Sequence, residues 1–429
     1  MKNTFLKSTI ILLIGGLITK VFGFIIRIIY TKELGEKGIA LHSLIMPTYS
    51  LLITFASFNI QTAISQRISS KKDTKKVIIS SCYIMLILNI IVITTTILLS
   101  KTISTNLLKN KDTLMPIIAC ALTLPFISIG YIIKGYFYGK QNITPHMISN
   151  IIEQLFRLII ISTILPKIAK YSTVHSVTFL ILFNILSETI SVIILLIFVP
   201  NKIKISKENI MPNKHESKEI LNITIPSITG RLLGNIGYFF EPIILTHVLL
   251  AKGFNINYIT LEYGVYNAYS ISLLLFPSFF ISAISNALMP EISKLKSENN
   301  KIIIKKRIKQ SLIISIITGI ICTTFIYIFK EKLLLKLYNT NKGIDYIKTL
   351  TPFFVLFYLE APLSSILIGL NKIKTCTTIS VTGVILKLIM MTIFAQLNKG
   401  IYALIYAEII NIIYVTYLNY HYVKKAIYT

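Results

Sequence analysis

A glycine-containing segment near the N-terminus places two cations inside a long apolar run. Gly16, Lys20, Gly23 and Arg27 follow one another at three- and four-residue spacing, which puts all four on one face of a helix. Ionisable groups are costly inside a membrane and usually face a water-filled cavity or a charged partner. A guanidinium group can donate two hydrogen bonds to a phosphate. Lys20 and Arg27 are therefore candidate contacts for an anionic substrate.

A later segment repeats this spacing with an acid in the last place. Three glycines are followed by Glu241, and Arg231 lies on an adjacent face of the same helix. We expect Arg231 and Glu241 to belong to the same substrate site as the two cations above. For the glycines of both segments, taken alone, close packing of neighbouring helices is the simpler interpretation. Those of the later segment are Gly230, Gly234 and Gly237.

Further charged residues lie inside other apolar runs. Glu153 and Arg157 are four residues apart, so a helix brings them together as an ion pair. This pair is either a self-neutralising structural pair or an ion-coupling site. The single charges in other runs are equally open candidates for a coupling ion, and the sequence does not choose among them. They are Glu188, Glu360, Lys387 and Glu408.

Motifs typical of enzymes or metal sites do not occur in the sequence. There is no phosphate-binding loop of the Walker type, no GxSxG motif, and no CxxC or HExxH spacing among the four cysteines and six histidines. We therefore expect no enzymatic activity, no metal and no cofactor. The energy for any transport would come from an ion gradient, the membrane potential or a lipid gradient.

The composition indicates a membrane protein. Of the 429 residues, 54% are hydrophobic and only 14% are charged, whereas an average soluble domain is roughly a quarter charged. Continuous apolar runs long enough to span a bilayer occur about twelve times. They predict an all-α polytopic membrane protein. The runs are Ser8–Tyr30, Ile39–Ile64, Val77–Leu99, Leu114–Ile133, Pro145–Leu165, Val174–Val199, Ile220–Leu250, Tyr263–Leu288, Ser311–Phe329, Tyr346–Leu370, Thr375–Leu397 and Ile401–Tyr420.

The positive charges are unevenly distributed between the loops. The chain has 44 Lys and Arg residues and a net charge of +27, and most of these cations fall in the termini and the even-numbered loops. Cytoplasmic loops of membrane proteins are enriched in Lys and Arg, so we expect both termini in the cytoplasm. The basic loops would then lie beside the headgroups of membrane lipids. No nucleic acid is needed to explain the charge.

Short internal matches indicate a duplicated architecture. Tyr49-Ser50 and Ala63-Ile64-Ser65 recur in the same register as Tyr269-Ser270 and Ala283-Ile284-Ser285. We expect two parallel six-helix repeats, residues 1–205 and 206–429, around a central cavity. Transporters built from such repeats bind their substrate between the halves, near the bilayer midplane.

Several stretches resemble the stage V sporulation protein B family of polysaccharide transporters. This family belongs to the multidrug/oligosaccharidyl-lipid/polysaccharide exporter superfamily, as do the lipid II flippases. The resemblance covers most of the chain. It is strongest in IKGYFYGKQNITPHMISNIIEQLFRL, Ile133 to Leu158, and extends to GGLITKVFGFIIRIIYTKEL (Gly15 to Leu34), LLLFPSF (Leu273 to Phe279) and IGLNKIK (Ile368 to Lys374).

The resemblance implies a flippase in the cytoplasmic membrane. Its substrate would be an undecaprenyl-pyrophosphate-linked sugar precursor for cell wall, spore cortex or surface polysaccharide, moved by alternating access. Members commonly have two more C-terminal spans than the runs found here, which leaves the sugar and the lipid open. Two alternatives remain: a cation-coupled multidrug antiporter of the same superfamily, and a non-transporting membrane scaffold for wall synthesis. The oligomeric state stays open as well.

Overall fold

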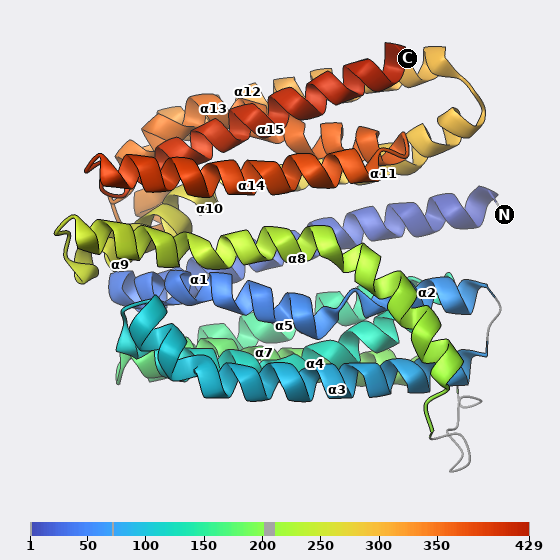
Figure 1. The fold of residues 1–429 in the computed structure, drawn as a ribbon, viewed down its shortest axis with the longest axis horizontal. Helices are drawn as coiled ribbons and strands as arrows, with labels where there is room; N and C mark the ends of the chain where they lie inside the picture. The colour runs from blue at the N-terminus through green and yellow to red at the C-terminus, as the bar shows by residue number, and fades with distance from the viewer. Residues whose placement is uncertain (1, 71–72, 201–210, 429) are drawn as a thin grey trace. The chain divides into compact units, whose positions relative to one another are not determined.

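The computed structural model describes residues 2–70, 73–200 and 211–428, and every regular element in them is helical (Figure 1). An α-helix satisfies all its backbone hydrogen bonds within one segment, which is what a lipid environment requires. The elements are α1 (Lys2–Ser57), α2 (Ile60–Ser69), α3 (Thr74–Lys101), the π-helix η1 (Thr102–Leu107), the 3₁₀ turn η2 (Lys111–Thr113), α4 (Leu114–Gly139), α5 (Thr144–Thr163), α6 (Leu165–Ala169), α7 (Thr173–Ile197), α8 (Lys214–Ala251), α9 (Ile256–Gly264), the π-helix η4 (Val265–Ile271), α10 (Ser272–Leu275), α11 (Ser278–Ser297), α12 (Lys301–Tyr338), α13 (Ile344–Gly369), α14 (Ile373–Gln396) and α15 (Tyr402–Tyr428).

The described helices confirm the all-α polytopic membrane fold. Nine of them are long and apolar enough to cross a membrane, and the bent pair Ile256–Leu275 and Ser278–Ser297 raises this number to ten. The prediction of about twelve spans is consistent with this result, because the first two apolar runs fall within one continuous stretch, Gly15–Ser69. The backbone of α1 nevertheless breaks at Gly35, where φ is 61°, a conformation that favours glycine. The last run forms α15, which is not among the ten.

The chain forms two compact units, Met1–Phe239 (unit 1) and Phe240–Thr429 (unit 2), which divide within α8. The boundary expected from the sequence, between residues 205 and 206, lies outside the described residues. The division into two six-helix lobes at that point stays a prediction.

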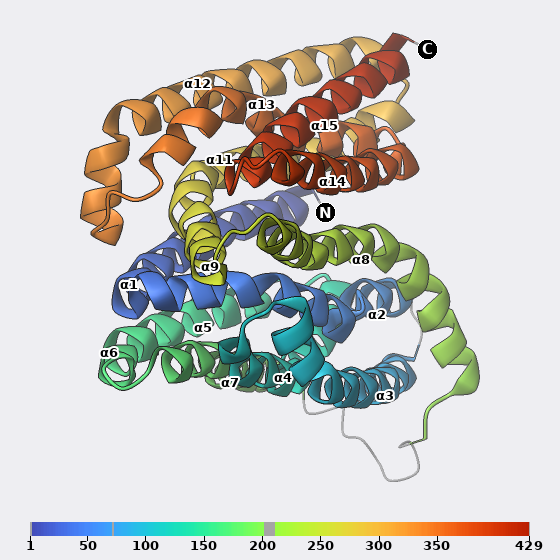
Figure 2. The same cartoon turned by 60° about the vertical axis from the view of Figure 1, so that its left-hand side comes forward.

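In unit 1, α4 is the central helix. It contacts α2, α3 and α7, while α5 packs against α7 and α1 (Figures 1 and 2). Two glycines let α2 approach α4 closely. A Cβ atom added at Gly135 would lie 3.0 Å from Ile64 Cβ, and one added at Gly139 would lie 2.7 Å from Ile68 Cβ.

Three of the glycines that the sequence singled out do not have this role. A Cβ atom added at Gly16, Gly23 or Gly234 would meet no atom within 4 Å. The interpretation of these three as close-packing positions is therefore wrong. The sequence spacing showed which face of the helix they share, but the distance to the neighbouring helix depends on the tertiary fold.

In unit 2, α13 is the central helix. It contacts α11, α12 and α15, and α14 packs against α15. Gly383 on α14 makes that second contact close, because a Cβ atom there would lie 2.5 Å from Val415 Cγ2. The tight pairing of α14 with α15 places the charged residues of these two helices within reach of each other.

Candidate functional site

Unit 1 contains a cavity of about 440 Å³ lined by residues of α1, α4, α5 and α7. This volume is in the range of small-molecule sites. Apolar side chains such as Ile53 and Leu180 form part of the wall. The polar lining consists of Arg27, Tyr30, His42, Tyr49, Tyr131, Glu153, Gln154, Arg157, Asn184 and Glu188.

A network of ion pairs connects the walls of this cavity. Arg157 Nη2 donates to Glu153 Oε1 at 2.9 Å and to Ser187 Oγ at 2.9 Å. Lys134 Nζ lies 4.0 Å from Glu153 Oε2 and 4.0 Å from Glu188 Oε2. All four charged side chains are largely buried, with at most 21% of any of them exposed. Such groups are kept in the membrane by mutual neutralisation.

Lys134 is a part of this network that sequence reasoning missed. The apolar run ends at Ile133, so Lys134 counted as a loop cation, whereas α4 continues to Gly139. The sequence did contain a hint of this contact, because Gly130 lies one helical turn before Lys134 and leaves space beside it. A Cβ atom at Gly130 would lie 3.2 Å from Glu188 Oε2 and 4.0 Å from Lys134 Nζ. Gly130 therefore leaves room for this contact.

Only one of the three predicted substrate residues of unit 1 lines the cavity. Arg27 lines the cavity, together with Glu153 and Arg157. Lys20 and Arg231 are exposed and do not belong to its lining. Two arginines and two glutamates line the cavity, so their formal charges cancel when His42 is neutral. The cavity thus contains two guanidinium groups, but the formal charge of its lining is zero.

The fourth predicted residue, Glu241, lies in unit 2 in a separate ion cluster. Lys387 Nζ is 2.6 Å from Glu241 Oε2 and 2.5 Å from Glu408 Oε2. The hydroxyl of Tyr263 donates to Glu241 Oε1 at 3.0 Å. Only 4% of the Glu241 side chain is exposed. The structure therefore pairs three charges that the sequence could identify only one by one.

Both ion clusters include charges from the last two apolar runs of the expected halves. In unit 1, Glu153, Arg157 and Glu188 come from α5 and α7, whereas Lys134 comes from α4. In unit 2, Lys387 and Glu408 come from α14 and α15, whereas Glu241 comes from α8. Three members of the unit 1 cluster, Glu153, Arg157 and Glu188, line the cavity.

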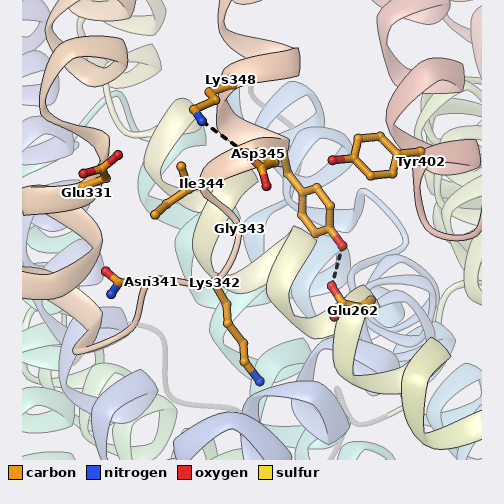
Figure 3. A pocket seen from close by; sticks show the side chains of 10 residues that line it. Glu262, Glu331, Asn341, Lys342, Gly343, Ile344, Asp345, Lys348 and Tyr402 are labelled. Atoms are coloured by element: carbon orange, nitrogen blue, oxygen red, sulfur yellow. Dashed lines mark hydrogen bonds and ion pairs between the residues drawn. The ribbon is translucent and has the colours of Figure 1, made fainter.

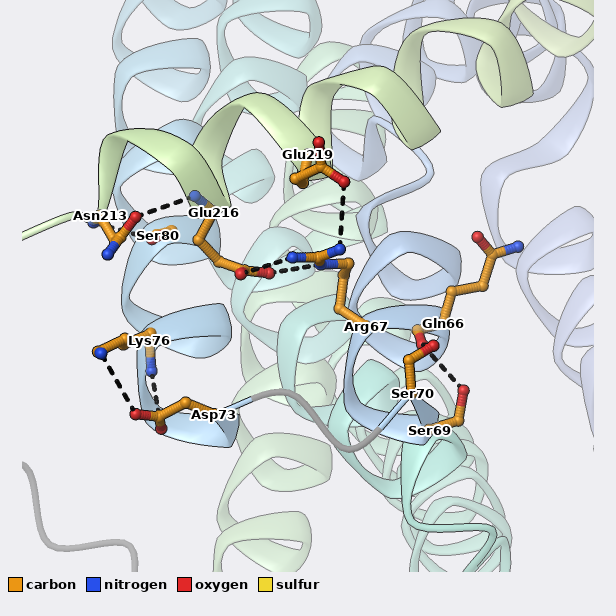
Figure 4. A network of polar contacts seen from close by, with 10 residues as sticks. All are labelled: Gln66, Arg67, Ser69, Ser70, Asp73, Lys76, Ser80, Asn213, Glu216 and Glu219. Atoms are coloured by element: carbon orange, nitrogen blue, oxygen red, sulfur yellow. Dashed lines mark hydrogen bonds and ion pairs between the residues drawn. The ribbon is translucent and has the colours of Figure 1, made fainter.

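A second ion cluster of unit 1 lies away from the cavity lining. Arg67 on α2 binds both carboxylate oxygens of Glu216, with Nε 2.6 Å from Oε1 and Nη2 2.8 Å from Oε2 (Figure 4). Glu219 accepts a further hydrogen bond from Arg67 Nη1 at 3.2 Å. Asn213 and Ser80 form another link between α8 and α3. These contacts fasten the beginning of α8 to α2 and α3.

Unit 2 has its own cavity, of about 530 Å³, around the turn between α12 and α13. Tyr346 donates a hydrogen bond to Glu262, and Lys348 Nζ lies 3.3 Å from Asp345 Oδ1 (Figure 3). Gly343 has a positive φ of 88°, which allows the tight turn. Glu331 and Tyr402 lie on opposite sides of this turn in Figure 3, so the polar groups do not converge on one point.

Comparison with known proteins places the chain in a family. The family model described as polysaccharide biosynthesis protein matches residues 5–296, and the model named MatE matches residues 265–393. Stage V sporulation protein B of Bacillus subtilis (strain 168) is 28% identical over 438 residues, covering 99% of this chain and 85% of that protein. The lipid II flippase MurJ of the same organism is 22% identical over 426 residues, covering 91% of this chain and 77% of that protein.

A solved structure shows the same fold. The inward-facing conformation of a multidrug resistance MATE family transporter of the MOP superfamily superposes with a TM-score of 0.77 at 14% identity, covering 98% of each chain. MOP is the multidrug/oligosaccharidyl-lipid/polysaccharide superfamily of the resemblance noted above. With more than half of its length matched by the first family model, the chain belongs to the polysaccharide biosynthesis protein family, and it is a multi-pass membrane protein with the fold of this MATE transporter.

Proposed function

We propose that this protein is a flippase for a lipid-linked sugar precursor, an undecaprenyl-pyrophosphate-linked saccharide, in the cytoplasmic membrane. Both termini would lie in the cytoplasm, and the product would serve cell-wall, spore-cortex or surface polysaccharide synthesis. The partners in this proposal are the lipid-linked precursor and the surrounding membrane lipids. No cofactor is needed, because translocation changes no covalent bond.

The cavity of unit 1 is the observation that carries the proposal. It contains two guanidinium groups, Arg27 and Arg157, in a volume of about 440 Å³. Arginine forms paired hydrogen bonds with phosphate oxygens, and these bonds strengthen where water is scarce. The name of one relative, a lipid II flippase, supports the same substrate class, and the name of another, a stage V sporulation protein, fits a role in sporulation.

The remaining predicted residues have supporting roles in this proposal. Lys20 and Arg231, which are exposed, would contact parts of the substrate outside the cavity. Glu241 would act through its ion cluster in unit 2 rather than on the substrate. Transport would proceed by alternating access, and an inside-negative potential would favour outward movement of an anion by about 2.3 kcal/mol per charge per 100 mV.

Transport by the Arg27→Ala variant tests the proposal. The full chain is reconstituted into vesicles with a fluorescent undecaprenyl-pyrophosphate-linked sugar, and a quencher outside reports movement between leaflets. We expect flipping by the wild type. In Arg27→Ala the flipping rate should fall at least about tenfold, because the substrate loses an arginine contact worth about 1.4 kcal/mol or more. Arg27→Lys should be intermediate, because lysine keeps the charge but not the planar fork.

A matched arginine outside the cavity is the control. Arg307 pairs with Glu291 at 2.7 Å, with 46% of its side chain exposed, and Arg307→Ala should flip as the wild type does. Normal flipping by correctly inserted Arg27→Ala protein would reject the proposed function.

A cation-coupled multidrug antiporter is the second candidate. The MatE match over residues 265–393 favours it, as do the two carboxylates, Glu153 and Glu188, in the cavity lining. Carboxylates can exchange a proton or sodium ion for a cationic drug. Export of an organic cation that depends on Glu188 and is unaffected by Arg27→Ala would establish this function instead.

A further inference from the structure

Arg157 already has an anionic partner inside the substrate cavity. Its Nη2 donates to Glu153 Oε1 at 2.9 Å, and both residues line the cavity. A charge-assisted bond of this length is among the stronger polar contacts in proteins. A phosphate that approaches Arg157 therefore meets a guanidinium group whose strongest partner is a carboxylate of the same helix.

The network offers Glu153 a second cation on the neighbouring helix α4. Its other oxygen, Oε2, lies 4.0 Å from Lys134 Nζ, just beyond hydrogen-bond length. Lys134 is 12% exposed and does not belong to the cavity lining. A small rotation of the Glu153 carboxylate toward Lys134 would bring it to a cation that it shares with Glu188, whose Oε2 also lies 4.0 Å from Lys134 Nζ, without contact to Arg157.

Ser187 on α7 holds the guanidinium group independently of Glu153. Its Oγ accepts from Arg157 Nη2 at 2.9 Å and from Nε at 3.2 Å. Arg157 would thus stay in position when the carboxylate moves away. Arg157 thus has one charged partner that lies near a second cation, and one neutral partner on another helix.

We propose that Glu153 is a built-in competitor for the anion at Arg157, and that a diphosphate binds by displacing Glu153 toward Lys134. The proposal rests on the proposed function, since it assumes that the cavity takes a phosphorylated substrate. It adds a reason why the site would select a diphosphate over a monophosphate. A diphosphate, with charge on two adjacent groups, can engage Arg27 and Arg157 together and so compensate for the lost ion pair. A monophosphate lacks the second group.

Inorganic pyrophosphate and orthophosphate are suitable probes for this exchange. Their binding to the purified full chain in nanodiscs is measured by calorimetry for the wild type and Glu153→Gln. Glutamine keeps the size of the side chain but loses the charge. We expect Glu153→Gln to bind pyrophosphate about tenfold more tightly and to discriminate less against orthophosphate. Glu153→Asp, whose carboxylate is set back by one methylene, should be intermediate and covers the case in which Glu153→Gln does not fold.

Lys134→Gln tests the second half of the exchange. Without Lys134 the displaced carboxylate has no cation to move to, so pyrophosphate should bind about tenfold more weakly than to the wild type. Glu219→Gln is the matched control, because Glu219 also pairs with an arginine, Arg67, at 3.2 Å but outside the cavity lining. Its pyrophosphate affinity should equal that of the wild type.

The outcomes separate this inference from the proposed function. If the wild type binds pyrophosphate and Glu153→Gln binds it equally or more weakly, Glu153 is a structural partner of Arg157 and the exchange is overturned while the proposed function stands. If neither the wild type nor any Glu153 variant binds pyrophosphate, both fail together. Tighter binding in Glu153→Gln with unchanged Glu219→Gln supports the exchange.

Discussion

The Nζ atom of Lys387 on α14 lies 2.6 Å from the Oε2 atom of Glu241 on α8. The same ammonium group is 2.5 Å from Glu408 Oε2 on α15, so one cation binds carboxylates from two other helices. Only 16% of the Lys387 side chain is exposed. A cation that bridges two buried carboxylates reduces the repulsion between them and ties together the three helix segments of unit 2 that contain these residues.

Lys387→Met should therefore destabilise the protein strongly. Methionine fills a similar volume but leaves two carboxylates without a cation, and removing one partner of a buried pair costs about 3–5 kcal/mol. The free energy of unfolding, or the midpoint of thermal unfolding in detergent, measures the change. The triple variant Lys387→Met, Glu241→Gln, Glu408→Gln should recover most of the loss, because no unpaired charge is left. A triple variant as unstable as the single one would contradict this explanation.

The bond between Arg67 and Glu216 leads to a local prediction. Arg67→Met should loosen the beginning of α8, because Glu216 loses both of its charge-assisted hydrogen bonds and becomes a largely buried unpaired charge, at about 3 kcal/mol. Hydrogen exchange of the backbone amides of residues 214–222 should become faster, with unchanged exchange in α13. The nearby exposed pair of Lys76 and Asp73, at 3.9 Å, provides the control. Lys76→Ala should cost only about 0–1 kcal/mol, and equal effects of the two substitutions would count against the special role of Arg67.

The all-α membrane fold could be predicted from the sequence, and the partners of the charges could not. Apolar runs depend on local composition, so the described part of each run is mainly helical, in one helix or in consecutive helices. The pairing of Lys387 with Glu241 and Glu408 depends on which helices are neighbours, and that information is not local. Glu153 and Arg157 were predictable as a pair because one helix contains both. Lys134 was missed because the end of an apolar run is not the end of its helix.

The glycines show the same limit. Spacing alone assigned a packing role to Gly16 and Gly234, beside which the structure leaves open space, and it gave no such role to Gly135, which lies against α2. A helix face can be derived from periodicity. Whether another helix approaches that face to within a methyl group is a property of the assembled unit.

Gly135→Ala should destabilise unit 1, whereas Gly234→Ala should not. The added methyl group at Gly135 would lie 3.0 Å from Ile64 Cβ and 3.1 Å from the backbone of Gln61, so α2 must move, at a cost of about 1–3 kcal/mol. At Gly234 nothing lies within 4 Å, and the higher helix propensity of alanine should be neutral or stabilise by up to about 1 kcal/mol. Thermal unfolding of the two variants checks the difference. A larger loss in Gly234→Ala than in Gly135→Ala would show that the helix contacts are assigned wrongly.

Gly23 allows the cavity of unit 1 to be blocked without removing a charge. It lines the cavity, and no atom lies within 4 Å of an added Cβ, so Gly23→Phe should place an aromatic ring in the space of about 440 Å³. The free energy of unfolding should not fall, because phenylalanine has a better helix propensity than glycine. Flipping of the lipid-linked sugar, measured in the vesicle assay, should fall at least about tenfold.

Gly16→Phe is the matched control for this substitution. Gly16 shares the helix and the open surroundings of Gly23 but is absent from the cavity lining, so its variant should transport normally. In cells that depend on this protein, the same pair of variants distinguishes a transporter from a scaffold. A transporter fails in Gly23→Phe because its substrate path is filled. A scaffold would still support wall synthesis, because the residues that contact its partners would be unaltered.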